Sequence, residues 1–408
     1  MPMIAHVSSW VLPVSGPPIR DGAVVVQGDR IAAVGPAAEV LTGFTGLICE
    51  HGGGAILPGV VNCHVHLEFS GLAGKVPPQA RWEDWLEATL TAYGALSPEE
   101  IEAGIAQAME ALWQSGAVLA GEVTNTGASW PHLESGPLSY HLFYECLGFD
   151  LLKKFNLPEL FPWFGRPEVA GTAWVSAAAH APYSVSAALF RAIAEWNAAR
   201  SGLQMVHLAE SQAEIDFLAG GNGFFEGLLQ RRGRWVPDYQ APRLSPPAYL
   251  HRLGFLGPRT LTVHGTQLTA SDCDLLAETK TWLVLCPRAN RFTGAGAPPV
   301  PDLLQAGVNL ALGTDSLAGN WDLNLFGEML WLYQNFPACP GSLWLRQGTL
   351  NGARALGRDR EFGSLTPGKK AALGFIPLGG SRDFWGELFT AGAAGKWRWL
   401  ELADVPGN

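Results

Sequence analysis

Short apolar segments alternate with longer amphipathic segments along most of this chain. Eight apolar runs of five to eight residues span 56–63, 117–123, 140–146, 173–179, 203–207, 260–264, 281–286 and 308–313. Between them, 97–116 has helical periodicity with Ser97 as a cap, Glu100 three residues later and a final Gly, and 184–202 follows the same logic. Strand-then-helix units repeated eight times predict an α/β fold, a parallel (β/α)₈ barrel of the TIM type.

The two ends of the chain have a different pattern. GAVVVQGDRIAAVG (22–35) reads as two short β-branched strands joined by a turn, and short strands return in 362–380. We therefore expect 58–357 to form the barrel, with 1–57 and 358–408 making one small β-sandwich domain beside it. The tail contains three tryptophans, Trp385, Trp397 and Trp399. We expect them to cover the small domain, and the alternative is that they form a homodimer contact.

Polar residues gather where the predicted strands end. In barrels of this type the functional side chains lie at the carboxyl ends of the strands. Five of the ten histidines occupy such positions, together with one carboxylate directly after the eighth run: His64, His66, His180, His207, His264 and Asp315. Since random placement would rarely produce this, the pattern favours a functional site over scattered buried histidines.

Four of these residues predict a metal site. Zn²⁺ binds imidazole nitrogen and carboxylate oxygen, and a catalytic site keeps one position for water. The predicted ligands of a single ion per chain are His64, His66, His207 and Asp315. Such an ion would lower the pKa of its water from about 15.7 towards about 7. Fe²⁺ and Mn²⁺ suit the same ligand types, so the metal stays open between the three.

Four residues are candidates for proton transfer or substrate contact. Asp315 could also accept the proton of the water, Glu210 could act as a proton shuttle, and His264 could hydrogen-bond the attacking oxygen. His180 is expected to face the substrate. Each residue also has a structural alternative: a helix cap for Asp315, a solvated first-turn carboxylate for Glu210, and simple packing for the imidazoles.

Composition excludes several classes of protein. The net charge is −10 and the pI is near 5.5, which argues against nucleic acid or anionic membranes as partners and leaves a small-molecule substrate. The paired H-x-E and P-C-x-x-C signature of the nucleic-acid-editing zinc deaminases is missing, because P-C-x-x-C does not occur in the chain. There is no long apolar run or signal peptide, and six scattered cysteines are typical of free thiols in a reducing cytoplasm.

The same motifs resemble the amidohydrolase superfamily over nearly the whole chain. PGVVNCHVHLE is similar to its strand-one metal motif, VHLAES to its strand-five His with the following Glu, TVHGT to its strand-six His, and LGTDS to its strand-eight Asp. At the end of strand four, SAAAHAPYS offers His180 where binuclear members carry a bridging Lys or Glu. The resemblance therefore implies a mononuclear site of the deaminase and chlorohydrolase branch.

Finer features resemble aminodeoxyfutalosine deaminases of menaquinone biosynthesis and their relatives. HVHLEFS, the helix RWEDWLEATL, CPRAN and GTDSLAGN carry this likeness. It implies a metal-dependent deaminase of an aminated purine-type ring. In addition to His180, the candidate substrate-binding residues are Glu68, Trp82, Arg288 and Asn290. The alternatives are a chlorohydrolase or cyclic-amide hydrolase with the same site, and a non-catalytic barrel scaffold.

Overall fold

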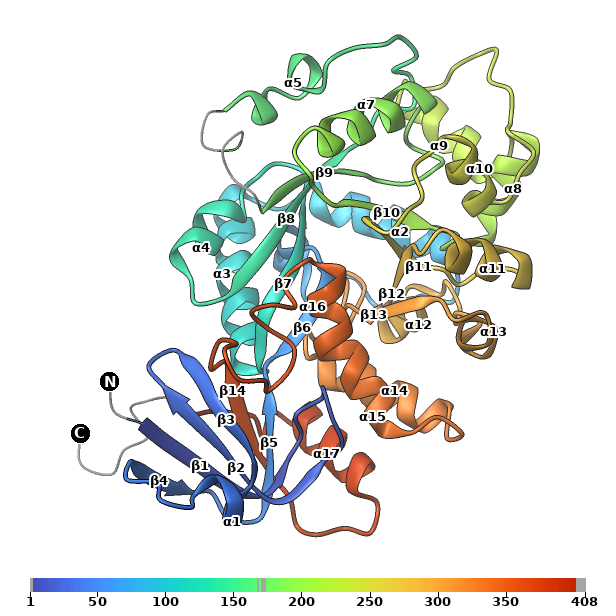
Figure 1. The fold of residues 1–408 in the computed structure, drawn as a ribbon. Helices are drawn as coiled ribbons and strands as arrows, with labels where there is room; N and C mark the ends of the chain where they lie inside the picture. Colours follow the sequence, from blue (N-terminus) through green and yellow to red (C-terminus); the bar gives the residue numbers. More distant parts are fainter. Residues whose placement is uncertain (1–2, 167–168, 170–173, 401–408) are drawn as a thin grey trace.

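Eight parallel strands form the larger part of the protein (Figure 1). The computed structural model describes residues 3–166, 169 and 174–400. The strands pair in sequence order, and their bounds are β6 Val60–Val65, β7 Ala117–Thr124, β8 Ser139–Cys146, β9 Val175–Ala179, β10 Gln204–Leu208, β11 Thr260–His264, β12 Trp282–Leu285 and β13 Asn309–Leu312. Each lies within or close to a predicted run, although residue 173 lies outside the described residues. The predicted barrel fold is confirmed.

The first and last strands of this sheet meet where β13 ends. The backbone N–H groups of Thr314 and Asp315 both donate to the carbonyl oxygen of His64, at 3.1 and 3.0 Å. Gly313 permits this approach, because a Cβ there would lie 2.8 Å from the Cβ of His64. The buried Asn62 amide donates to Thr314 Oγ1 at 2.7 Å and accepts from the Thr314 N–H at 3.2 Å. The eight strands therefore close into a barrel around residues 62–64 and 313–315.

Helices follow the strands and bury one face against them. In α3 (Pro98–Gln114) the predicted capping box is present, since Ser97 and Glu100 exchange side-chain and backbone hydrogen bonds. Helix α7 (Ala187–Ala198) begins after Ser186, later in the chain than the pattern predicted. The other helices include α2 Trp82–Tyr93, α4 Trp130–Ser135, α8 Gln212–Gly220, α9 Phe224–Arg231, α10 Pro246–Arg252, α11 Ala270–Glu278, α12 Pro287–Thr293, α13 Val300–Ala306, α14 Leu325–Asn335, α15 Gly341–Arg346 and α16 Gly352–Ala355. No helix in the part of the chain described here combines the length and apolar character needed to cross a membrane.

A separate mixed sheet is built from both ends of the chain (Figure 1). Its strands are β1 Met3–Val11, β2 Ile19–Gln27, β3 Arg30–Pro36, β4 Leu47–Glu50, β5 Gly54–Pro58, β14 Leu373–Pro377 and β15 Arg398–Trp399. The predicted hairpin in 22–35 is present as the antiparallel pair of β2 and β3. The terminal parts 1–2 and 401–408 of the predicted small domain lie outside the described residues, and its exact boundaries stay predictions.

The apolar run 56–63 is divided between the two sheets. Its first half belongs to β5, which pairs with β14 and β1, and its second half belongs to β6 of the barrel. The change of sheet falls at Gly59. A Cβ atom at this position would lie only 2.8 Å from the Val118 Cβ, so a side chain would not fit there. The prediction of one continuous strand was wrong here, because an unbroken apolar run does not show where the chain changes its hydrogen-bonding partner.

The tail contributes a helix and tryptophan packing. Helix α17 (Phe384–Ala393) packs against α14 and lies beyond 362–380, where short strands were expected. Trp397 is buried, and Trp399 stacks on Trp113 of α3 with ring centroids 4.2 Å apart. Trp385 packs against Phe389 within α17. These contacts within the chain support the covering interpretation of the tail.

Candidate active site

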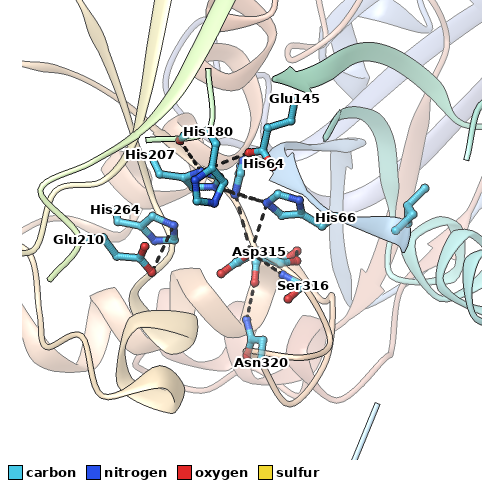
Figure 2. Close-up of polar contacts among 12 residues, drawn as sticks. His64, His66, Glu145, His180, His207, Glu210, His264, Asp315, Ser316 and Asn320 are labelled. Carbon is cyan, nitrogen blue, oxygen red and sulfur yellow. Dashed lines mark hydrogen bonds and ion pairs between the residues drawn. The ribbon is translucent and has the colours of Figure 1, made fainter. Parts of the chain in front are cut away.

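Three imidazoles converge at the carboxyl ends of β6 and β10 (Figure 2). The Nε2 atoms of His64, His66 and His207 lie 3.2, 3.3 and 3.4 Å from one another. Two ligands of a tetrahedral zinc ion bound at 2.0–2.1 Å are separated by about 3.3 Å. The three nitrogens therefore stand at the mutual distances that one ion requires.

Asp315 completes the donor set from β13. Its Oδ1 lies 3.7 Å from His64 Nε2 and 3.8 Å from His66 Nε2. The Ser316 N–H donates to the same Oδ1 at 2.8 Å and so fixes the orientation of the carboxylate. The three imidazoles form a group whose atoms lie close enough together to hold one ion, and Asp315 faces two of them. Three nitrogens with a neighbouring carboxylate oxygen, all nearly excluded from solvent, are the donor chemistry of a catalytic divalent ion that keeps a position for water.

Burial keeps the imidazoles in the form that binds metal. It lowers the pKa of His64 and His66 well below the usual range and lowers that of His207 to about 3. A neutral imidazole ligates through one nitrogen while the other holds a proton. In His207, Nδ1–H donates a hydrogen bond to the carbonyl oxygen of His180 at 2.8 Å, which leaves Nε2 directed at the cluster.

Glu210 and His264 form a second pair beside the imidazole cluster (Figure 2). His264 Nε2 lies 3.7 Å from Glu210 Oε1, and its Nδ1 donates to Asn290 Oδ1 at 2.8 Å. Burial raises the pKa of Glu210 to about 7 and that of Asp315 to about 6. Carboxyl groups poised near neutrality can both take up and release a proton during one reaction.

The turns that carry these side chains have unusual backbone geometry. Ala209, His264 and Asp315, which follow or end β10, β11 and β13, all have positive φ angles, between 50° and 75°. Such conformations are costly for non-glycine residues and persist where surrounding contacts enforce them. One such contact is the buried Glu214 carboxylate, which accepts from the N–H groups of Ala209 and Glu210 at 3.0 Å each.

A cavity of about 330 Å³ opens over this site. His66, His207, Glu210, His264 and Asp315 line its polar side. The remaining lining is largely aromatic and aliphatic, and it includes His180 and Trp82 from the predicted set, with Phe69, Trp85, Leu86, Thr89, Leu90, Tyr93, Asn125, Glu145, Leu147, Tyr183 and Ser316. A mostly apolar concavity with a few convergent polar groups is typical of a small-molecule site.

Three of the predicted substrate-binding residues do not line the cavity. Glu68 is buried behind it, where its carboxylate accepts from the N–H groups of Asn125, Thr126 and Ala128 after β7. Arg288 forms a two-pronged ion pair with Asp322 at 2.7 and 2.8 Å. Asn290 contacts His264 instead. The Glu68 carboxylate and the Arg288 guanidinium are occupied by protein partners, whereas Asn290 uses Oδ1 towards His264 and its buried Nδ2 has no partner among the described residues. All three side chains lie outside the cavity lining.

Sequence reasoning missed two contributors to the site. Glu145 is the penultimate residue of β8, and its Oε1 lies 3.4 Å from His207 Nδ1 while Asn125 donates to its Oε2 at 2.8 Å. The rule of strand ends, applied to YHLFYEC, would have found it. The second is the rest of the α2 face that begins with the predicted Trp82, and the spacing of apolar residues in WEDWLEATLTAY carried the signal.

Known sequences match this chain over most of its length. The sequence model described as the Amidohydrolase family matches residues 157–385. A 5-methylthioadenosine/S-adenosylhomocysteine deaminase of Syntrophobacter fumaroxidans is 31% identical over 389 residues, covering 86% of this chain and 79% of the relative. An aminodeoxyfutalosine deaminase of Deinococcus radiodurans is 28% identical over 359 residues, covering 84% of this chain and 82% of the relative.

Solved structures share the fold. An adenosine deaminase from Xanthomonas campestris with bound zinc superimposes with a TM-score of 0.77 at 24% identity, over 97% of this chain and 90% of that one. The agreement extends over both sheets, because nearly the whole chain is covered.

Proposed function

Because this chain belongs to the amidohydrolase family, we propose that it is a metal-dependent hydrolase that removes the amino group from the purine-type ring of a nucleoside. The observation that carries the proposal is the convergence of His64, His66, His207 and Asp315 beside Glu210 and His264 in one cavity. The names of the relatives support an amino group as the leaving group, since both relatives described above are named as deaminases. A complete donor set disfavours the non-catalytic scaffold.

The predicted ligands would hold one Zn²⁺ per chain, with Fe²⁺ or Mn²⁺ as alternatives. When bound, such an ion supplies a Lewis acid that makes a water molecule acidic near neutral pH. Asp315, whose Oδ1 faces His64 and His66, would accept a proton from the attacking water. His264 hydrogen-bonds the attacking oxygen through Nε2, which is held in place by the bond from Nδ1 to Asn290.

Glu210 delivers protons to the substrate. With a pKa raised to about 7 by burial, its carboxyl group carries a proton for part of the time at neutral pH. That proton goes to the ring nitrogen next to the amino-bearing carbon, which makes the ring accept the attacking oxygen. Glu210 then takes up the proton released by Asp315 and passes it to the departing amine, which leaves as ammonia. The hydroxyl proton on the ring carbon returns to Glu210 as the carbonyl forms, which restores the starting protonation state.

The finer predictions extend this proposal. Aminodeoxyfutalosine, and with it menaquinone biosynthesis, is one member of the proposed substrate class. The six free cysteines, four of them buried, suit a reducing cytoplasm. A homodimer remains the proposed alternative to a monomer.

The test compares leaving groups and variants on zinc-loaded protein. We expect ammonia from 5′-substituted adenosines and no chloride from chlorinated rings. Glu210→Gln should keep its metal and lose about 10²- to 10⁴-fold in kcat. Asp315→Asn should lose both metal and turnover, whereas Glu361→Gln, outside the cavity, should change neither. Normal turnover by Glu210→Gln would contradict the proton-shuttle role, and chloride release without ammonia would replace the deaminase by a chlorohydrolase.

A further inference from the structure

The indole N–H of Trp82 is a buried donor without a regular hydrogen bond. Trp82 is the first residue of α2, is 3% exposed and lines the cavity. Its Nε1 has no hydrogen-bond partner among the described residues. Buried polar groups are nearly always hydrogen-bonded, so an exception in the wall of this cavity requires an explanation.

Glu210 is the acceptor that faces this donor. Both side chains line the same cavity, and Glu210 is buried as well. Burial raises the pKa of Glu210 to about 7, and a hydrogen-bonding contact with Trp82 acts in the opposite direction. The contact falls short of regular hydrogen-bond geometry, as catalytic hydrogen bonds often do in proteins without bound substrate.

The Glu210 carboxylate receives no regular hydrogen bond within the part of the chain that the structure describes. His264 Nε2 lies 3.7 Å from its Oε1, which is too far for one. Glu214 and Thr266 bind only the backbone N–H and carbonyl groups of Glu210. An ionised carboxylate without a donor is strongly disfavoured away from water. When a substrate displaces the water of the cavity, Glu210 therefore needs a protein donor once it has released its proton.

Packing holds the Trp82 ring where it can supply that donor. The ring meets Tyr183 and Phe225 edge-on, with centroids 6.2 and 5.8 Å away, and it packs against Trp85 at 6.0 Å. An indole N–H donates hydrogen bonds and accepts none. It can therefore stabilise the ionised carboxylate of Glu210 without taking up the proton that the substrate must receive.

We propose that Trp82 is a positioning residue whose indole N–H holds the ionised carboxylate of Glu210 during proton transfer. This inference rests on the proposed function, in which Glu210 carries protons to and from the substrate. Hydrogen bonding to the charged form of an acid favours that form, so Trp82 assists Glu210 each time it releases a proton. The alternative acceptor for this N–H is an atom of the substrate.

Nuclear magnetic resonance of the indole N–H tests the contact without turnover. In zinc-loaded protein with isotopically labelled tryptophan and no substrate, the signal that is missing from Trp82→Phe identifies Trp82. We expect its proton shift to titrate with pH in the parent and to lose this titration in Glu210→Gln. Trp85 is the matched control on the same helix, because its N–H already donates to the Ala318 carbonyl at 2.8 Å. Its signal should have the same pH dependence in both proteins.

The pH dependence of kcat/KM tests the consequence for proton transfer. In the proposed function kcat/KM falls on the alkaline side as Glu210 loses the proton that the ring nitrogen must receive. Trp82→Phe keeps an aromatic ring and removes the N–H, so the alkaline midpoint should move upward by about 1 pH unit, as expected for one hydrogen bond to a charged group. The same loss should lower kcat about tenfold and change KM less. Trp85→Phe should leave the midpoint unchanged, whatever its effect on kcat.

Two outcomes would overturn the inference. One is a Trp82 signal that does not titrate in the parent, or that titrates equally in Glu210→Gln. The other is a rise in KM alone in Trp82→Phe with an unmoved alkaline midpoint, which would assign the N–H to the substrate. Absence of ammonia release from 5′-substituted adenosines would instead contradict the proposed function. The two failures are distinguishable, because the resonance measurement needs no substrate.

Discussion

Replacing Glu145 by Gln should weaken metal binding although Glu145 is not among the predicted ligands. His207 Nδ1 has two acceptors: the carbonyl oxygen of His180 at 2.8 Å and Glu145 Oε1 at 3.4 Å. The Glu145 charge makes the imidazole more basic, opposing the larger lowering of its pKa by burial. A carboxylate that hydrogen-bonds a ligating histidine typically changes metal affinity by 10- to 100-fold.

The structure places the expected effect at the lower end of that range. The shorter contact, to the His180 carbonyl, survives the substitution and still fixes the tautomer of His207. What disappears is the charge at 3.4 Å, so we expect the Kd for zinc to rise about tenfold, equivalent to about 1.4 kcal/mol. Asn125 would still hold the side chain through Nδ2, which donates to the Oε2 position at 2.8 Å.

Competition with a chromophoric chelator at fixed pH measures this Kd. Glu361→Gln is the matched control, because its carboxylate pairs with Arg358 and Lys370 away from the cavity. Its Kd should equal that of the parent. Unchanged zinc affinity in Glu145→Gln would refute the reasoning, and an equal loss in the control would show that the effect comes from net charge or folding.

Further predictions concern residues that hold the site together. Asn62→Ala removes two buried hydrogen bonds to Thr314, and urea denaturation should show a free energy of unfolding lower by about 2–4 kcal/mol. Asn290→Ala leaves His264 Nδ1 without its acceptor, so kcat/KM should fall about tenfold while bound zinc, measured by metal analysis, stays constant. Burial raises the pKa of Glu214 from 4.5 to about 8, so the folded protein binds a proton that the unfolded chain releases above about pH 4.5. This contribution to stability is complete below pH 4.5 and is lost as the pH rises towards 8, and urea titrations at several pH values should therefore show a steeper decline for the parent than for Glu214→Gln.

Strand ends were the part of the site that the sequence predicted well. A strand of four to six buried residues leaves a continuous apolar run, and its last residue is marked by the change to polar side chains. His207, His264 and Asp315 were found in this way, and each lies at the predicted end of its strand. The capping box at Ser97 was equally visible, because it depends on residues three positions apart.

Features that depend on distant contacts could not be predicted in the same way. Glu68 looked like a pocket residue because it follows His66, yet its carboxylate turns to backbone N–H groups about 60 residues later in the chain. The helix α17 and the change of sheet at Gly59 likewise depend on partners elsewhere, α14 and β14. Local pattern reports burial and periodicity, and it carries no information about which of several possible partners a segment meets.

The closure of the barrel at β6 and β13 determines the order in which the site can be assembled. The His64 carbonyl and the Asn62 amide bind Thr314 and Asp315, about 250 positions later in the chain. During synthesis, His64 and His66 therefore leave the ribosome long before Asp315 has been added to the chain. If these residues hold one ion, as proposed, the full donor set exists only after the eighth strand has been made and has closed on the first.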